Sequence, residues 1–404
     1  MTAGGLSVIV VSRHRPAALA RCVTGLRQQL GVALEVVVVA DSAGIAAVQA
    51  DDLKLVTFDE ANISAARNLG LAQAAGEIIA FIDDDAVAEP TWAWRLLAAF
   101  EDAGTVAATG YVRGRNGISL QWRCSSVDAL GLDHEVALPD EGVHYPDPGP
   151  GRAIKTQGTN CAFRASVLRG IGGFDPNYRF YFDETDVNLR LLGAGKTAVI
   201  PLAQVHHGYL ESERRRADRV PLSLHEIGAS TAVFLRRHAA EEIEAGRLRL
   251  IEEQGRRLDG YLAGRKIDRA EAERLMGTLA LGWQDGLARP MSRLAPLQGS
   301  APSWRELKKT ATGGGVLLIG WRWSLPRLRA EAERQVKAGK IVTVLCLSAG
   351  VRRHWQEFSA AGYWLQKGGI WGLSDRKAPI SVGKRYSKRL AELSSEFRRF
   401  RPVN

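Results

Sequence analysis

The chain has 404 residues, a formal net charge of +10 and a pI near 9.6. This length is more than one ordinary core needs, so two or three domains are expected, and 46% hydrophobic against 24% charged residues excludes a disordered chain. The four cysteines are scattered without CxxC spacing, which excludes a disulfide scaffold and indicates free thiols.

The first residues, MTAGGLSVIVVSRHRP, contain only a short apolar run, and no apolar stretch in the sequence approaches the length of a membrane span. We therefore expect a cytoplasmic protein, with any contact to the inner face of the membrane being peripheral. The basic excess gathers in ESERRRADR and in the tail GKRYSKRLAELSSEFRRFRP. Because zinc-finger spacing and RRM-type aromatic motifs are missing, we expect no nucleic-acid partner; anionic lipid or a phosphate-bearing substrate explains the charge.

Strands and helices alternate at short intervals through the first part of the chain. Apolar, β-branched runs predict buried strands at LSVIVV, LEVVVVADS and EIIAFI, and helical spacing marks PAALARCVTGLRQQ and NISAARNLGLAQAAG. This alternation predicts an α/β fold with a mostly parallel sheet and helices on both faces. Ligands bind outside the carboxyl ends of such strands, where Asp41 and the run Asp83–Asp85 lie.

The rest of the chain divides by composition. A stretch rich in Gly, Pro and Asp reaches to about residue 157, charged helices fill about 210–289, and a loop with four Pro and Gly residues precedes a strand–helix–strand unit. The predicted regions are 1–112 and 113–210 (two halves of one α/β domain), 211–300 (charged helices) and 301–404 (a C-terminal α/β accessory domain).

The adjacent carboxylates of Asp83, Asp84 and Asp85 repel one another. A divalent cation removes this repulsion, and oxygen ligands suit Mg²⁺ or Mn²⁺. The alternative is a solvated acidic turn or a helix cap. A second acidic group, DETD, places Asp183 and Asp186 on one helix face and Glu184 on another, although the helix dipole alone also favours acids in a first turn.

Six motifs occur in an order that resembles the family 2 glycosyltransferases with the GT-A fold, over residues 6 to about 210. They are SVIVVSRHRPAALARCVTGL, LEVVVVADS, NISAARNLGLAQAAGEIIAFIDDDAV, GTNCAFRASVLRGIGGFDP, DETDVNLRLLGAG and VHHG. The resemblance implies metal-dependent, inverting transfer of a sugar from a nucleotide-diphosphate sugar to a hydroxyl of a glycan, lipid-linked or protein acceptor. It also implies that residues 1–112 are the nucleotide-sugar-binding half and 113–210 the acceptor and catalytic half of the domain.

The resemblance also implies site residues. Asp85 is the expected ligand of Mn²⁺ or Mg²⁺, with Asp83 near the metal or the ribose, and Glu184 is the expected catalytic base, with Asp183 as the alternative. Many family members supply a histidine from a motif like VHHG. Because neighbouring strand residues face opposite ways, only one can readily face the site; we select His207, with His206 as runner-up and a packing role as the alternative.

Donor binding is expected to involve a wider set of residues. The set is Arg13, Asp41, Asn62, Arg67, Asp83, Asp84, Gly158 and Asn160. A helix cap explains Asn62 equally well. The chain has Ala40 where the family often has a first acid, so the resemblance to UDP-sugar enzymes leaves the nucleotide base open. A retaining transferase and a non-catalytic scaffold are the rival interpretations, and the tryptophan-rich C-terminal region resembles no family.

Overall fold

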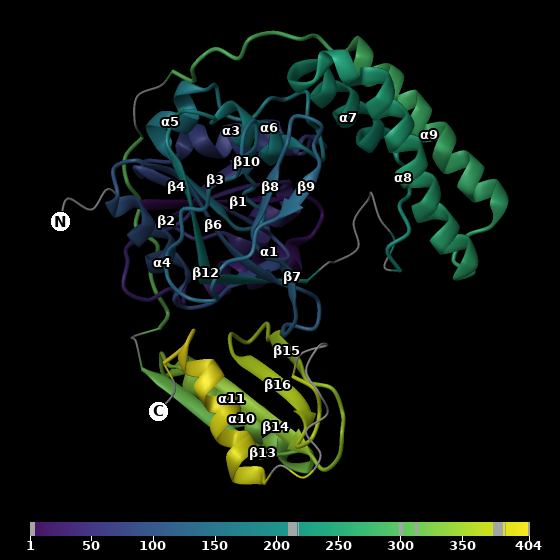
Figure 1. Cartoon of the computed structure of the whole chain (residues 1–404). Coiled ribbons are helices and arrows are strands. Elements are labelled where there is room, and N and C mark those ends of the chain that lie inside the picture. The colour runs from purple at the N-terminus through teal and green to yellow at the C-terminus, as the bar shows by residue number, and fades with distance from the viewer. Residues whose placement is uncertain are drawn as a thin grey trace.

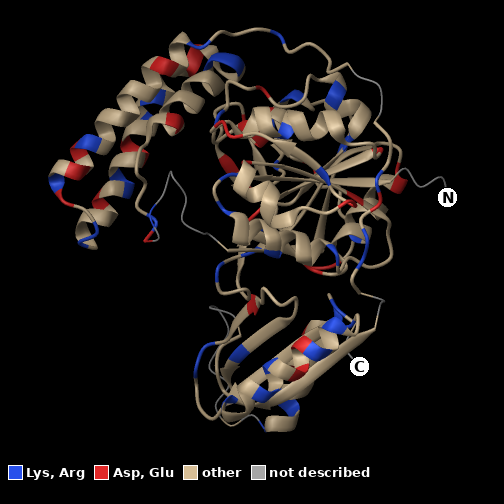
Figure 2. Cartoon of the chain, turned by 180° about the vertical axis from the view of Figure 1, so that it is seen from behind, with Lys and Arg blue, Asp and Glu red and all other residues tan. Residues whose placement is uncertain are grey.

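The computed structural model describes residues 5–208, 216, 218–298, 302–311, 314–374, 383 and 385–402. Three parts follow one another along the chain (Figure 1, and from behind in Figure 2): a large-sheet domain, a helical bundle and a small-sheet domain. They span residues 5–208, 218–298 and 302–402. The boundaries expected at 210 and 300 lie outside the described residues and remain predictions.

Within the described residues, the large sheet has nine strands in the order β3-β2-β1-β4-β11-β6-β12-β5, with β7 paired to β6. Strands β3, β2, β1 and β4 are parallel, β11 is antiparallel to both neighbours, and β12 is parallel to β6. The predicted α/β fold with a mostly parallel sheet is confirmed. The bounds are β1 (Leu6–Ser12), β2 (Leu34–Ala40), β3 (Lys54–Thr57), β4 (Ile78–Asp83), β5 (Ala86–Ala88), β6 (Thr105–Arg113), β7 (Leu120–Trp122), β11 (Cys161–Arg164) and β12 (Lys196–His207).

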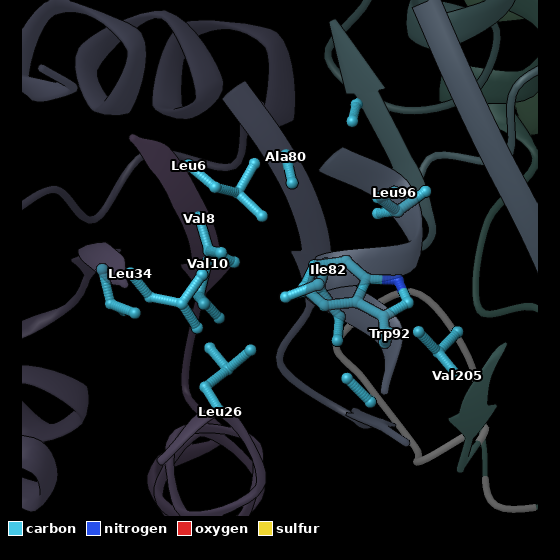
Figure 3. Packing of buried hydrophobic residues seen from close by; sticks show 14 of the residues in the cluster. Leu6, Val8, Val10, Leu26, Leu34, Ala80, Ile82, Trp92, Leu96 and Val205 are labelled. Atoms are coloured by element: carbon cyan, nitrogen blue, oxygen red, sulfur yellow. The ribbon is translucent and has the colours of Figure 1, made fainter. Parts of the chain in front are cut away.

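Helices cover both faces of this sheet because its strands are apolar on both sides. Val8 and Val10 pack on one face with α1 and with Trp92 of α4 (Figure 3), whereas Ile9 packs on the opposite face with α3. Each such fully buried side chain stabilises the fold by about 1.5–3 kcal/mol. The helices are α1 (Pro16–Leu26), α2 (Ser42–Val48), α3 (Ile63–Gln73), α4 (Trp92–Ala98), α5 (Ala165–Gly170) and α6 (Asp183–Arg190), with a 3-10 helix at Ala99–Glu101.

The segment between β6 and β11 forms a second, three-stranded sheet beside the large one. Its strands are β8 (Ser125–Val127), β9 (Asp133–Glu135) and β10 (Ala153–Ile154). Strand β6 runs across the predicted division between residues 112 and 113, so the two predicted halves share one continuous sheet. That division remains a prediction.

The helical bundle contains α7 (His225–His238), α8 (Ile243–Ala263) and α9 (Arg269–Ala288), and Figure 1 shows α8 and α9 extending away from the large sheet. Helices α7 and α9 approach closely at Gly282, where an added Cβ would lie only 1.9 Å from the carbonyl oxygen of His225. Helix α7 also packs on the large-sheet domain: Phe234 stacks on Phe182 with ring centroids 4.5 Å apart, and His238 Nε2 lies 2.9 Å from Asp186 Oδ1. The bundle therefore packs against and stabilises the start of α6.

The small-sheet domain has the strand order β13-β14-β16-β15. Strands β13, β14 and β16 are parallel, so the expected strand–helix–strand unit is extended by two more strands and a second helix. The elements are β13 (Gly315–Trp321), α10 (Leu325–Lys337), β14 (Ile341–Ser348), β15 (Trp355–Phe358), β16 (Trp364–Gly369) and α11 (Tyr386–Arg398).

The small-sheet domain contacts the large sheet at the amino end of β16. Trp364, the first residue of β16, forms a small buried cluster with Phe358 and with Val87 of β5. Gln28 of the large-sheet domain donates a 2.6 Å hydrogen bond to the carbonyl oxygen of Gly362 nearby. In the described part of the chain, no helix combines the length and apolar character that crossing a membrane requires.

Candidate active site

The three aspartates form the turn between β4 and β5, at the carboxyl end of a parallel strand. Strand β5 pairs antiparallel with the end of β12, so that Ala86 lies opposite His207. The amide of Gly208 continues this pairing by donating a 2.8 Å hydrogen bond to the Asp85 carbonyl oxygen. This backbone pairing brings a histidine from residue 207 beside the acidic turn, more than one hundred residues earlier in the chain.

Asp83, Asp85 and His207 converge on one point. Nε2 of His207 lies 3.2 Å from Oδ1 of Asp85 and 4.0 Å from Oδ2 of Asp83. The three potential ligand atoms lie within 4.8 Å of one another. Burial raises the pKa of Asp83, and the charges of Arg67 and His207 only partly oppose this effect. Two carboxylates and one imidazole in this arrangement fit Mn²⁺ or Mg²⁺ by donor chemistry.

Neighbouring side chains fix the His207 imidazole. Its Nδ1 lies 3.3 Å from Oε1 of Gln121, which leaves Nε2 directed to Asp85. Trp122 stacks on the imidazole ring, with centroids 5.7 Å apart and planes 30° apart. A hydrogen-bond partner on one ring nitrogen is the usual way in which proteins orient a metal-binding histidine. His206 faces the opposite side of β12, where its Nε2 lies 2.7 Å from Glu89.

The Asp84 side chain contacts the end of β1 and the loop that follows it. Its carboxylate accepts a 2.6 Å hydrogen bond from Ser12 Oγ and pairs with Arg15 at 2.5 Å. Burial raises the pKa of Asp84 to about 7, although the Arg15 charge opposes the rise. Arg15 also lies 3.4 Å from Asp85. Asp84 thus anchors the acidic turn on the loop that follows β1, and its expected contact with the donor stays a prediction.

Asp41 organises the neighbouring loop. Its carboxylate caps α2 by accepting from the amides of Ala43 (2.9 Å) and Gly44 (3.1 Å), and it accepts a 2.6 Å bond from the His14 amide. Burial alone would raise the pKa of Asp41, but these three hydrogen bonds outweigh burial and lower it. Next to this loop, Arg13 Nε donates a 2.9 Å bond to Asp59, a carboxylate that sequence reasoning did not single out.

Arg67 lies between the acidic turn and the start of α6. Its guanidinium pairs with Asp183, lies 3.7 Å from Asp83, and donates a 3.1 Å hydrogen bond to the Gly158 carbonyl oxygen. A Cβ at Gly158 would stand 2.9 Å from the guanidinium, so a larger residue there would require Arg67 to shift. The side chain is buried, with Phe174 at 5.2 Å. These carboxylates outweigh burial and raise the pKa of Arg67, which was expected to meet the nucleotide.

Glu184 lies in the first turn of α6, shortly after two residues with an unusual backbone conformation. Tyr181 and Phe182 both have positive φ, at 74° and 67°, which costs energy for residues other than glycine. Burial, followed by the charge of Asp183, raises the pKa of Glu184 to about 7. Because Asp183 is paired with Arg67, Glu184 is the acidic residue of this turn whose electrostatics suit proton acceptance near neutral pH.

Two further residues of the expected donor set have structural partners. Asn160 is fully buried and uses its amide on Trp92 Nε1 (2.8 Å) and on the Ala203 carbonyl oxygen (2.8 Å). Asn62 caps α3 by accepting from the amide of Ala65. Donor binding by these side chains remains a prediction.

Sequence reasoning also missed Gln121, Ser12 and Arg15. Ser12 is the last residue of β1 and Arg15 follows shortly after it, so the rule that places ligands at strand ends could have identified them. Gln121 lies in a stretch of weak periodicity and carries no comparable signal.

The comparisons with known proteins agree on the type of domain. The family model described as glycosyl transferase family 2 matches residues 7–170. The pre-mycofactocin glycosyltransferase of Mycobacterium tuberculosis, in two strains, is 30% identical over 218 residues, which cover 50% of this chain and 43% of the relative. This chain therefore spans less than half the length of the curated relatives that it matches.

Solved structures of similar arrangement are more distant in sequence. TarS 1-349 of S. aureus in complex with UDP-GlcNAc is 19% identical with a TM-score of 0.45, covering 70% of this chain and 81% of that one. GalNAc-T7 with UDP, GalNAc and Mn2+ is 14% identical with a TM-score of 0.43, covering 58% of this chain and 48% of that one.

Proposed function

We propose that the chain transfers a sugar from a nucleotide-diphosphate sugar to an acceptor hydroxyl, with inversion at the anomeric carbon. The premise is the match of residues 7–170 to the family model of glycosyl transferase family 2. The single observation that supports this most is the convergence of Asp83, Asp85 and His207 within 4.8 Å. One guanidinium, that of Arg67, connects this cluster to the helix of Glu184 by pairing with Asp83 and Asp183.

In the proposed reaction, Asp83, Asp85 and His207 would hold Mn²⁺ or Mg²⁺. When bound, such an ion offsets negative charge on the departing diphosphate. The acceptor oxygen forms the new bond to the anomeric carbon while the bond from that carbon to the diphosphate oxygen breaks. Glu184 takes the hydroxyl proton, and its pKa of about 7 suits a base that works near neutral pH.

Arg67 supports this division of roles among the acids. It pairs with Asp183, while burial and the charge of Asp183 raise the pKa of Glu184. The two positive-φ residues Tyr181 and Phe182 hold the start of α6 in a conformation that α7 stabilises through the Phe182–Phe234 stack. The strained backbone is thus maintained where Glu184 must be positioned.

We further propose a UDP-sugar donor, with Arg13 and Asp41 nearest to the base. Three backbone amides already bind the Asp41 carboxylate, and Asp59 pairs with Arg13, so both residues are held in place before a nucleotide arrives. Because Ala40 stands where related enzymes often have a first acid, the base must be identified by experiment. The acceptor is a hydroxyl of a glycan, a lipid-linked sugar or a protein.

Calorimetry with a panel of UDP-, GDP- and TDP-sugars, in Mn²⁺ or in chelator, tests this function. We expect one diphosphate nucleotide to bind the wild type only with metal, and this binding to be lost in Asp85→Asn. Proton NMR of the first product formed should show the inverted anomer. If no nucleotide in the panel binds in either condition, the transferase proposal is wrong and a scaffold role replaces it; a retained anomer contradicts the inverting role of Glu184.

A further inference from the structure

The positive charge of the chain is concentrated in its last quarter. Residues 301–404 contain 21 Lys and Arg against 7 Asp and Glu, a net charge of +14, whereas residues 1–300 carry a net charge of −4. Figure 2 shows the mixed charges of the helical bundle and, at the other end of the molecule, the many basic positions of the small-sheet domain. The small-sheet domain is therefore the part most attracted to a negatively charged partner.

The carboxyl ends of β13, β14 and β16 form a distal edge of this domain. The amino end of β16 packs on the large-sheet domain through Trp364 and Val87, and the three strands are parallel, so their carboxyl ends point away from that domain. Helix α11 runs back toward the large sheet, because Tyr386 in its first turn contacts the end of β13 while Arg399, just past its last turn, accepts a 2.9 Å hydrogen bond from Arg95.

Three aromatic rings form a rigid stack at this distal edge. Trp321, the last residue of β13, stacks on Trp323 with centroids 5.3 Å apart and planes 6° apart, and on Tyr386 at 5.2 Å and 13°. Ser324 Oγ donates a 2.8 Å hydrogen bond to the Trp321 carbonyl oxygen and so fixes the turn between the two tryptophans. Even so, Trp323 remains 77% exposed to solvent. A preformed stack that leaves an indole in water indicates a binding surface.

Basic side chains surround the stack. Four segments meet at the distal edge: 321–324, 348–353, 369–372 and 385–388. Their exposed basic residues are Arg322, Arg352, Arg353, Arg385 and Lys388. None of these segments contains an aspartate or a glutamate. The backbone ties two of them together, because the Gly369 amide donates a 2.8 Å hydrogen bond to the Arg352 carbonyl oxygen. Val351 adds an exposed apolar side chain between these arginines and the strand end.

We propose that the distal edge of the small-sheet domain docks on the surface of an anionic lipid bilayer. Tryptophan and tyrosine favour the membrane–water interface because one end of each ring system is apolar and the other polar. Arginine and lysine beside them are attracted by anionic headgroups, and each contributes about a fivefold gain in affinity near the surface. The stack disfavours single-stranded nucleic acid, which needs successive open ring faces, because Trp321 already stacks on both Trp323 and Tyr386.

This proposal goes beyond the transferase function and does not depend on it. The test uses the full chain and flotation with vesicles of phosphatidylcholine alone or with 30% phosphatidylglycerol, at low and high salt. We expect binding only to the anionic vesicles, loss of binding at high salt, and a roughly 25-fold weaker affinity in the double variant Arg352→Gln/Arg353→Gln. Trp323→Ala should weaken binding and remove the quenching of tryptophan fluorescence by brominated lipid.

A matched variant controls for general charge. Arg247→Gln/Arg256→Gln removes two exposed charges from α8 in the helical bundle, far along the chain from the distal edge, and should bind vesicles as the wild type does. Far-ultraviolet circular dichroism confirms that each variant is folded. Equal binding to neutral vesicles, no binding to anionic vesicles at low salt, or full displacement from vesicles by single-stranded DNA at equal charge would each overturn the proposal.

Discussion

Glu89 and Arg401 form a fully buried, two-bond ion pair between the large-sheet and small-sheet domains. Arg401 Nε and Nη2 donate to the two carboxylate oxygens of Glu89 at 2.6 and 2.5 Å, and each side chain is 1% exposed. The Arg401 guanidinium also lies 3.8 Å from the centre of the Trp364 ring. Burial alone would raise the pKa of Glu89, but Arg401 and His206 outweigh it and hold that pKa far below its usual range.

Replacing one member of this ion pair should destabilise the protein far more than replacing both. Arg401→Met leaves a buried, unpaired carboxylate, so we expect a loss of about 3–5 kcal/mol in unfolding free energy. The double variant Glu89→Gln/Arg401→Met should lose less than the two single variants together, because neither buried charge remains. Urea denaturation measures both effects. Lys196→Met removes the exposed partner of Asp102 and should change stability by less than about 1 kcal/mol; an Arg401→Met variant no weaker than this control would contradict the prediction.

The stability of this junction should fall as the solution becomes acidic. Burial lowers the pKa of His206 to about 4, although Glu89 opposes the shift, while an unfolded histidine titrates near 6.5. Between these values only the unfolded chain takes up the proton, so unfolding becomes easier as pH falls from 6.5 to 4, by up to about 3 kcal/mol. Denaturation curves at several pH values measure this slope.

The His206→Gln variant should flatten that pH dependence, because glutamine has no proton to gain in this range. An unchanged slope in His206→Gln would assign the acid sensitivity to other groups.

Metal binding should depend both on the aspartates that precede β5 and on His207 at the end of β12. We expect Asp85→Asn and His207→Ala each to weaken Mn²⁺ affinity by more than about tenfold, measured by calorimetry without nucleotide. His225→Ala is the matched control. It belongs to another group of possible ligands in the described residues, with Glu226 and Asp285, but Arg289 already pairs with both of those carboxylates at 3.0 and 2.6 Å. Equal affinity in His207→Ala and His225→Ala would remove His207 from the metal site.

The orientation of His207 gives a separate prediction. Gln121→Leu keeps the size of the side chain but removes the 3.3 Å contact with His207 Nδ1. Because such partners fix the ring and its tautomer, we expect a loss of about 10–100-fold in Mn²⁺ affinity with no change in thermal stability. Gln121→Glu, which retains an acceptor, should recover part of the affinity. Full affinity in Gln121→Leu would mean that the Trp122 stack alone orients the ring.

The transfer rate should rise with pH if Glu184 is the base. Its pKa is raised to about 7 and only the ionised form accepts a proton, so the rate should increase tenfold per pH unit below 7 and level off above it. Glu184→Gln should lower the rate by about 10²–10⁴-fold, remove this pH dependence and leave donor affinity intact. Asp183→Asn is the informative comparison, since it should remove the ion pair with Arg67 and weaken the positioning of the start of α6. Wild-type turnover by Glu184→Gln would exclude it as the base.

Much of the fold was predictable because burial leaves a local pattern. The apolar runs of β1, β2 and β4 identify buried parallel strands, and their ends place Asp41 and the acidic turn at one edge. Alternation of side chains in a strand predicts that only one of the two neighbouring histidines lies beside the acidic turn. In the structure His207 faces Asp85 and His206 faces Glu89, and metal binding by His207 remains a prediction.

Other features depend on distant partners that a local pattern does not contain. The pairing of β5 with β12 decides where the histidine lies, yet three-residue β5 has no strand signal of its own. The sequence around Arg67 does not reveal its pairing with the carboxylate of Asp183, which comes 116 residues later. Likewise, the interior role of Asn160 depends on Trp92 and Ala203, which belong to other elements.

The distance along the chain between Glu89 and Arg401 has a consequence for biosynthesis. The two residues are 312 positions apart, so at about 5–20 residues per second a ribosome makes Arg401 some 15–60 s after Glu89. During that interval Glu89, and the His206 ring once it is made, lack the cover that Arg401 and Trp364 give them in the complete fold. The strand β12 itself can already pair with β5 and β6, but its His206 face is covered late, and a stalled or shortened nascent chain would leave that face open to proteases and chaperones.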